Sequence, residues 1–405
     1  MDAHHPDRLG RPLELTASDS LVFVEQAVPV LEIGVVLLVA GLVGVGARRL
    51  GFPAVVGYLA VGLLVGPFTP GYVADKHQIQ VLADVGVVLL LFEVGIELDL
   101  RSLAKEPRGI LLAVPLQIAI VTAIGAAVAL ALGSPALGAV TLGLVAALSS
   151  SVVVVNITRS RKRTTDPVTE RALVVWALLQ DAATLVAATI LAVLLAPGGE
   201  SPALAFGRAV AFVVVAAVIQ GWAVPRLLAA VQDQPDSFLI LAVSAALAIA
   251  GVGAVIFGIP VALAAFVAGV LFSIRPIAQE ARREVLPFRD LFAVLFFVAI
   301  GTLVDPAAVA REPGWLAVFI GLVVMKAVVI AALDALFRIP GRNWQVAIGL
   351  AQIGEFSFVV LGLGVAAGVV SAGQSSAALA AAAITIALSA VGARLFRPNA
   401  DLARA

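Results

Sequence analysis

The sequence has no cysteine and only three histidines in 405 residues, and two of these, His4 and His5, stand close to the amino terminus. Thiolate redox chemistry and metal sites built from cysteine and histidine are therefore excluded. Charged residues are also scarce at 13%, whereas soluble globular proteins keep about 25%. The hydrophobic class makes up 61% of the chain, and the mean hydropathy is +1.10. These values exclude a soluble enzyme and predict a chain that lies within a lipid bilayer.

Charge of one sign is not in excess. Lys and Arg total 26, and Asp and Glu also total 26. A protein that binds nucleic acid through its phosphates shows a basic patch or stripe, which this balanced composition does not provide. We therefore expect no nucleic-acid partner.

Apolar runs bounded by charges, proline or glycine fill most of the chain. A helix that crosses the bilayer needs about 20 apolar residues, and shorter helices are tolerated inside the protein. We predict an all-α polytopic membrane protein with about thirteen transmembrane helices, at approximately 27–47, 53–67, 81–97, 109–131, 136–157, 172–196, 205–225, 237–257, 260–274, 287–304, 315–337, 344–367 and 376–396. Residues 1–26 are predicted to be a polar amino-terminal tail rather than a cleaved leader. Residues 27–396 then form one transmembrane domain, and 397–405 a short tail.

Lysine and arginine are distributed unevenly between alternate loops. One set of loops holds most of the 26 Lys and Arg residues, and the densest group lies between Arg159 and Arg171. Loops rich in these residues stay on the cytoplasmic side of a membrane. We expect the amino terminus outside, the carboxyl terminus in the cytoplasm, and a location in the bacterial inner membrane.

The sequence matches itself at a shift of about 206 residues, as expected for an internal repeat. Residues 51–64 align with 258–271 through shared glycine, proline, alanine and leucine, and two later segments agree on the same shift. The shift moves each predicted helix on by an odd number of helices, which inverts the second copy. We predict two inverted-topology repeats, about 27–196 and 237–396, a plan found in many secondary transporters.

Two predicted helices at corresponding places in these repeats contain residues that interrupt a helix. The helix 136–157 carries Ser149, Ser150 and Ser151 near its middle. The helix 344–367 carries three further residues of this kind at the corresponding depth, Gln352, Gly354 and Glu355. Serine and glycine weaken the helical hydrogen bonds, and opened backbone offers carbonyls to a cation. We predict crossed discontinuous helices and a substrate site beside them, and the alternative is small-residue packing between continuous helices.

Three ionisable residues share one depth near the middle of their predicted helices: Asp181, Lys326 and Glu355. A charge at the bilayer centre costs roughly 2.5–3.5 kcal/mol on insertion scales, so each suggests a function. We expect Lys326 and Glu355 to form a mutual pair that compensates the charge of the helix ends, and the alternative is a structural ion network. Glu93 is a supporting candidate that could face the core, whereas Glu97, at a helix end, is expected to be solvated or to cap the helix.

Six segments, in their order and spacing, resemble the Kef-type members of the cation:proton antiporter-2 family across essentially the whole chain. They are 91–99, 147–154, 179–181, 265–271, 295–301 and 351–358. The resemblance implies the sodium/proton-antiporter fold, and a homodimer in which a core bundle moves against a static dimerisation domain. It also implies that Asp181 binds a proton and a cation in alternation beside the crossed helices, without a further cofactor.

The residue before Asp181 bears on selectivity. Electrogenic sodium/proton relatives carry two adjacent acids here, whereas this chain has Gln180, as potassium-selective relatives do. We predict exchange of K⁺, or of Na⁺, for H⁺ by alternating access. Gln180 and the serine segment 149–151 would complete an oxygen shell around the cation at Asp181. With Asp181 ionised, the three midplane charges sum to minus one, so one proton or one monovalent cation neutralises them and exchange is expected to be 1:1 and electroneutral.

The chain departs from the Kef-type pattern in one respect. Those systems continue into a cytosolic nucleotide-binding regulatory domain, and here no glycine-rich phosphate loop follows the last predicted helix. A separate cytosolic regulatory subunit could take its place. Rival interpretations are a passive monovalent cation channel, an organic-anion symporter of related fold in which Lys326 binds the carboxylate, and a membrane sensor that does not transport.

Overall fold

The computed structural model describes residues 17–68, 76–98, 100–158, 165–195 and 201–392, and within these ranges the chain forms helices and no strands. The helices are α1 (Ala17–Leu50), α2 (Ala54–Val65), α3 (Lys76–Glu97), α4 (Leu100–Leu103), α5 (Arg108–Ala131), α6 (Ala136–Ala147), α7 (Ser151–Thr158), α8 (Pro167–Leu194), α9 (Pro202–Val218), α10 (Val224–Ala230), α11 (Pro235–Val255), α12 (Val261–Ser273), α13 (Ala278–Thr302), α14 (Pro306–Arg311), α15 (Pro313–Phe337), α16 (Asn343–Leu350), α17 (Phe356–Ala366) and α18 (Ala372–Gly392). A π-helical segment, Ile219–Ala223, joins α9 to α10.

Each predicted transmembrane segment corresponds to one of these helices or to a consecutive pair. Among the described residues, eight helices are long and apolar enough to cross a membrane, and α2, α6, α12 and α17 are shorter apolar helices. The number of thirteen crossings stays a prediction. Helix α1 begins at Ala17, inside the segment predicted as a polar tail, although its apolar part begins at Val28, close to the predicted start. Residues 1–16 and 393–405 of the two predicted tails lie outside the described residues.

Proline sets many helix starts. Pro167, Pro235 and Pro313 occupy the first helical position of α8, α11 and α15. This position suits proline because the amide that it lacks would have no partner within the helix. The short helices α2 and α12 each begin directly after a proline, Pro53 and Pro260. These two prolines belong to the two segments that match in the predicted repeat.

Two predicted transmembrane segments are broken near their middle, as expected. The helical geometry of α6 ends at Ala147 and α7 starts at Ser151, and the second break separates Leu350, at the end of α16, from Phe356, at the start of α17. The prediction of discontinuous helices is therefore confirmed. Small-residue packing between continuous helices does not describe these two segments.

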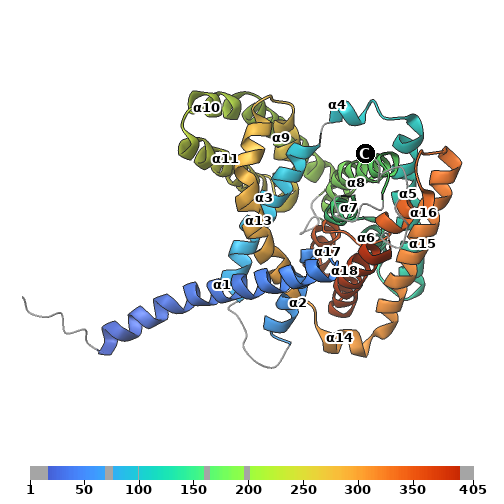
Figure 1. Cartoon of the computed structure of the whole chain (residues 1–405), viewed down its shortest axis with the longest axis horizontal. Coiled ribbons are helices and arrows are strands. Elements are labelled where there is room, and N and C mark those ends of the chain that lie inside the picture. Colours follow the sequence, from blue (N-terminus) through green and yellow to red (C-terminus); the bar gives the residue numbers. More distant parts are fainter. Residues whose placement is uncertain (1–16, 69–75, 99, 159–164, 196–200, 393–405) are drawn as a thin grey trace, which may run out of the picture.

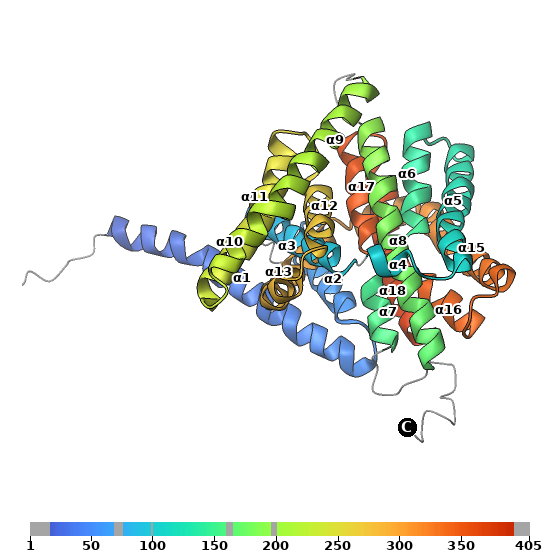
Figure 2. The same ribbon diagram turned by 90° about the horizontal axis from the view of Figure 1, so that it is seen from above.

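The helices form two groups (Figures 1 and 2). The scaffold group contains α1–α3 and α9–α13, in which α3 packs on α12 and α13, and α2 packs on α13. The core group contains α5–α8 and α15–α18, including both broken segments. Helix α8 packs on α12 and α9 and so lies where the two groups meet. Helix α1 runs past the scaffold group and extends away from the body of the protein (Figure 1).

Two glycine contacts hold the scaffold group together at backbone distance. A Cβ atom on Gly62 of α2 would lie 2.8 Å from Cα of Gly301 in α13, and a Cβ atom on Gly269 of α12 would lie 3.0 Å from Cα of Gly95 in α3. The predicted repeat aligns α2 with α12 and α3 with α13. The two contacts are then equivalent pairs, each joining a helix of one repeat to a helix of the other. This is the arrangement expected of inverted repeats, which remain a prediction.

Replacing Gly269 by alanine should separate α12 from α3, because the new Cβ atom would lie 2.1 Å from the carbonyl oxygen of Phe92. Overpacking of this kind costs about 1–3 kcal/mol. Thermal unfolding in detergent should show a lower midpoint. Gly251→Ala in α11 is the matched control, since within the described structure nothing lies within 4 Å of its Cβ position. That variant should keep or raise the midpoint, whereas an unchanged midpoint for Gly269→Ala would contradict the close contact.

Candidate functional site

The site is built on the crossing of the two non-helical segments, 148–150 and 351–355. The amide of Gly354 donates a hydrogen bond to the carbonyl of Leu148 at 3.1 Å. A Cβ atom on Gly354 would lie 2.3 Å from the carbonyl carbon of Ser149. Only glycine allows the two backbones to approach this closely, which explains its presence in the second break.

Side chains also bind the two broken segments to each other. The amide of Gln352 donates to the carbonyl of Ser150 at 3.1 Å. Two serine hydroxyls reach across in opposite directions, one from each segment: Ser149 donates to the carbonyl of Leu350 at 2.5 Å, and Ser357 donates to the carbonyl of Val145 at 2.8 Å. Backbone groups that the breaks release thus find partners inside the protein, as the hydrocarbon environment requires.

Lys326 lies at the carboxyl-terminal ends of α6 and α16, where both breaks begin. It is fully buried, and its ammonium donates to the carbonyl of Leu148 at 2.9 Å and to the carbonyl of Gln352 at 2.7 Å. These carbonyls follow the last turns of α6 and α16, where helix dipoles concentrate negative charge. Within the described residues, Lys326 is thus bonded to backbone carbonyls, and its predicted pairing with Glu355 stays a prediction.

Glu355 lies at the amino-terminal ends of α7 and α17, where both breaks end. It directly precedes Phe356, the first residue of α17, and its carboxylate accepts a hydrogen bond at 3.1 Å from the hydroxyl of Ser151, the first residue of α7. Helix amino termini carry partial positive charge, so a carboxylate placed between two of them is stabilised. Lys326 and Glu355 thus act on opposite ends of the broken helices.

Asp181 lies beside this amino-terminal pair. It belongs to α8, which packs on α7, α16 and α17, and it is 1% exposed. Its Oδ2 atom is buried and has no hydrogen-bond partner in the part of the chain that the structure describes. A buried carboxylate oxygen without a partner is costly unless it binds a proton or a cation.

The side chain of Gln180 provides a second buried oxygen next to Asp181 in the sequence. Its side-chain nitrogen donates to the side-chain oxygen of Gln117 in α5 and, at 3.4 Å, to the carbonyl of Ala147 at the end of α6. This direction of the amide leaves Oε1 of Gln180 buried and, among the described groups, without a donor. Gln117 also donates to Ala147 at 3.0 Å. Sequence reasoning assigned no site role to Gln117, although a glutamine within an apolar helical run is the signal that points to one.

The oxygens near the crossing suit a weakly bound cation. Oδ2 of Asp181, Oε1 of Gln180 and Oε1 of Gln352 are all buried and lack hydrogen-bond partners within the described residues. Oxygen ligands are those that hard cations prefer. The structure describes no group of three or more His, Cys, Asp or Glu residues that could hold a metal ion.

Glu93 does not join the crossing. It is fully buried in α3, and its carboxylate makes ion pairs with Arg282, at 2.5 Å, and with Arg289, both in α13. Arg282 also pairs with Glu97 at 3.0 Å, and Arg289 with Asp290 at 2.6 Å. The prediction that Glu93 faces the protein interior is confirmed, but its ion-pair partners belong to the scaffold group. Its supporting role in the site stays a prediction.

The amino-terminal end of α8, the helix that carries Asp181, is held in place by a helix cap. Asp166 caps α8 by accepting hydrogen bonds from the amides of Val168, at 3.1 Å, and Thr169, at 3.0 Å. The amide of Arg342, which precedes α16, donates to the Thr169 hydroxyl at 2.8 Å. The cap therefore joins the start of α8 to the start of α16 and fixes the depth of Asp181 relative to the crossing.

Comparison with known families identifies the chain. The family described as sodium/hydrogen exchanger, transmembrane, matches residues 34–396. The chain belongs to this family. Together with the eight long apolar helices, this makes it a multi-pass membrane protein. The family consists of transporters rather than enzymes.

Curated relatives and a solved structure agree with this assignment. YbaL of Escherichia coli (strain K12), named as a cation/proton antiporter, is 31% identical over 88% of the chain and 66% of its own length. K(+) efflux antiporter 5 of Arabidopsis thaliana is 29% identical over 82% of the chain and 60% of its own length. The chain thus spans about two thirds or less of the length of these relatives. The sodium proton antiporter MjNhaP1 of Methanocaldococcus jannaschii shares the fold, with a TM-score of 0.69 at 14% identity, covering 91% of this chain and 96% of that one.

Replacing Asp166 by alanine should lower the free energy of unfolding by about 1 kcal/mol near pH 7, as for other lost caps. Partial burial raises the pKa of Asp166, but hydrogen bonds from Thr169 and the charge of Arg342 outweigh it and hold this pKa below its ordinary value. A lowered pKa means that the ionised cap stabilises the fold above about pH 4, and that this contribution is lost as the pH falls further.

The difference in thermal midpoint between the parent and Asp166→Ala should therefore shrink below about pH 4. Asp166→Asn keeps an oxygen acceptor at the cap without the charge, and it should lose less stability than the alanine variant. A parent-to-alanine difference that stays constant down to about pH 3 would contradict the assignment of the cap to an ionised carboxylate.

Proposed function

We propose that the chain is a secondary transporter that exchanges a monovalent cation for H⁺ across the membrane by alternating access, with K⁺ favoured and Na⁺ possible as its cation. The observation that carries this proposal is the buried Oδ2 atom of Asp181, which has no hydrogen-bond partner among the described residues and lies beside the crossed broken helices. Two relatives named as cation/proton and K⁺ antiporters support it.

The exchange uses one carboxylate for two ligands in turn. A cation that reaches the crossing binds the oxygens of Asp181 and Gln180, and the proton on Asp181 leaves because one carboxylate cannot hold both. The loaded core group then becomes accessible from the other side, the cation dissociates, and a proton binds. Serines 149–151 contribute backbone and hydroxyl oxygens near the site. The ions are substrates, and the mechanism uses no cofactor.

The fixed charges of the site set the stoichiometry. Lys326 compensates the carboxyl-terminal ends of α6 and α16, and Glu355 compensates the amino-terminal ends of α7 and α17. Both are engaged by the protein, so their charges cancel and do not move relative to the crossing. Asp181 alone changes its occupant, and either a proton or one monovalent cation neutralises it. Exchange is then 1:1 and electroneutral.

The arginine-rich loops place the amino terminus outside and the carboxyl terminus in the cytoplasm of a cell membrane, the inner membrane in a bacterium. The scaffold group is the static part of a homodimer, and the core group is the moving part. A relative named as a glutathione-regulated potassium-efflux system protein supports K⁺ as the cation. A separate cytosolic regulatory subunit is a further proposed partner.

Asp181→Asn should abolish cation-dependent proton movement. The amide can bind neither a proton nor a cation with a compensating charge, so the exchange cycle loses its carrier group. The purified variant is placed in proteoliposomes with a pH-sensitive dye, and K⁺, Na⁺, Rb⁺ and Li⁺ are added in turn. Asp236→Asn, an exposed acid in the first turn of α11, is the matched control and should transport as the parent does. Undiminished exchange by Asp181→Asn in folded protein would overturn the proposed function.

Exchange by the parent protein should not depend on the membrane potential, because neither loaded state carries net charge through the bilayer. The dye signal is measured with K⁺ as the exchanged cation, in proteoliposomes with and without a membrane potential set by a gradient of the permeant anion thiocyanate. Equal rates are expected under both conditions. A rate that rises with potential would show that a second proton moves, and Lys326 would be the group that carries it.

A further inference from the structure

A cavity of about 530 Å³ lies where the scaffold group meets the core group. Its walls come from the ends of α8 and α17 in the core group, and from α9 and the turn between α11 and α12 in the scaffold group. Figure 2 shows α8, α9, α12 and α17 close together, and α8 packs on the other three. A molecule in this cavity therefore contacts both groups at once.

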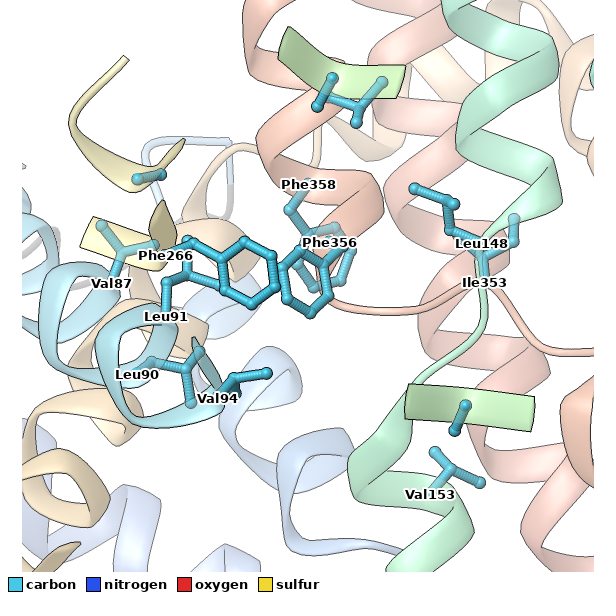
Figure 3. Close-up of a cluster of buried hydrophobic side chains, with 14 of the residues drawn as sticks. Val87, Leu90, Leu91, Val94, Leu148, Val153, Phe266, Ile353, Phe356 and Phe358 are labelled. Carbon is cyan, nitrogen blue, oxygen red and sulfur yellow. The ribbon is translucent and has the colours of Figure 1, made fainter. Parts of the chain in front are cut away.

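The cavity is separate from the crossing and from the carrier carboxylate. Thr189, which lines it, stands eight residues after Asp181 on α8, a rise of about 12 Å. Leu363, which also lines it, stands seven residues after Phe356 on α17, a rise of about 10 Å. Phe356 packs edge to face on Phe266 of α12, with ring centroids 5.3 Å apart (Figure 3). This aromatic pair lies at the depth of the crossing, and the cavity lies beyond it, toward the ends of α8 and α17.

Apolar surface surrounds a single positive charge in the described walls of this cavity. Arg208 of α9 is the only charged residue among the described residues that line it, and Thr189 and Gly258 are the only others that are not apolar side chains. The Thr189 hydroxyl donates to the carbonyl of Leu185 at 2.7 Å, so its oxygen can still accept a hydrogen bond. The guanidinium repels a small cation, and a small inorganic anion would lose its hydration against the apolar walls.

The turn after α11 positions the guanidinium of Arg208. Gly258 in this turn has a φ of 66°, which favours glycine, and a Cβ atom there would lie 3.7 Å from each of Cζ, Nη1 and Nη2 of Arg208. Equal distances to three atoms of the group mean that its plane faces the turn. The N–H donors lie within this plane and point sideways, in the fork that binds a carboxylate, sulfonate or phosphate through two hydrogen bonds.

We propose that this cavity binds an anionic amphiphile, a molecule with one acidic head group and an apolar body, and that the bound molecule holds the core group against the scaffold group. The head group binds Arg208, and the apolar body fills the space between α8, α12 and α17. Cavities of about 300–1,000 Å³ with apolar walls and a few placed polar groups are typical ligand sites. Inhibition of exchange by this ligand rests on the proposed function, whereas its binding does not.

Binding is tested with decane-1-sulfonate, which stays ionised and so carries no protons across a bilayer. In detergent it should raise the thermal midpoint of the purified parent protein, because a ligand of the folded state stabilises that state. Arg208→Gln should remove most of this increase, and Ala366→Leu, which narrows the cavity without changing its charge, should reduce it. Decan-1-ol has the same chain without the charge and should affect parent and Arg208→Gln equally. An equal response of these two proteins to the sulfonate would overturn the proposal.

Inhibition is measured in phosphatidylcholine proteoliposomes with the pH-sensitive dye, K⁺ as the exchanged cation and the sulfonate on both sides. The half-inhibitory concentration should rise about tenfold for Arg208→Gln, because a hydrogen bond between charged groups is lost. Arg208→Lys keeps the charge without the planar fork and should give an intermediate value. Arg311→Gln is the matched control. It removes an exposed arginine at the end of α14, on the same side of the membrane as Arg208 in the predicted topology, and should be inhibited like the parent.

The head group could belong to a free amphiphile or to an anionic lipid of the bilayer, and vesicles that contain phosphatidylglycerol distinguish the two sources. A lipid in the cavity competes with the sulfonate, so the difference between parent and Arg208→Gln should disappear, whereas a site for free amphiphiles keeps it. Sulfonate that stabilises the parent through Arg208 but leaves exchange unaffected would overturn the holding of the two groups. Absence of cation-driven proton movement in the parent would overturn the proposed function, while the thermal midpoints still decide whether the cavity binds the sulfonate.

Discussion

A helix that is interrupted inside hydrocarbon exposes backbone groups that water cannot reach, and every such group needs a partner from the protein. This chain contains two interruptions, and each supplies partners for the other. The amide of Gly354 bonds to the carbonyl of Leu148, and serines on both segments reach across to the opposite backbone. Lys326 also donates to the carbonyls of Leu148 and Gln352, just after the ends of α6 and α16. The positions of the other site residues depend on this reciprocal arrangement.

The crossing also creates the field in which Asp181 works. Lys326 occupies the negative ends of the broken helices and Glu355 occupies the positive ends, so the site contains fixed charges of both signs that are already engaged. Asp181, on a continuous helix beside them, retains a carboxylate oxygen that no described group bonds. The same hydrogen bonds that stabilise the breaks therefore leave one carboxylate oxygen of Asp181 without a partner, as the proposed exchange requires.

Sequence patterns predicted the features that depend on position along the chain. Hydropathy located the helices, the serines at 149–151 and Gly354 located the breaks, and equal depth brought Asp181, Lys326 and Glu355 to one region. The pattern could not show which way each side chain faces. It paired Lys326 with Glu355 because both carry charge at one depth, whereas backbone carbonyls compete for the same ammonium. The arginine partners of Glu93 are far from it in sequence, so only the packing of α3 on α13 reveals them.

The hydrogen bonds across the crossing run in both directions and involve backbone on both sides. The two half-sites consequently cannot flex independently without leaving polar groups bare in an apolar interior. In the proposed exchange, the crossing must therefore move as one rigid piece. The contact of Phe266 with Phe356 is suited to serve as the sliding surface, because aromatic rings can shift past one another without breaking a hydrogen bond.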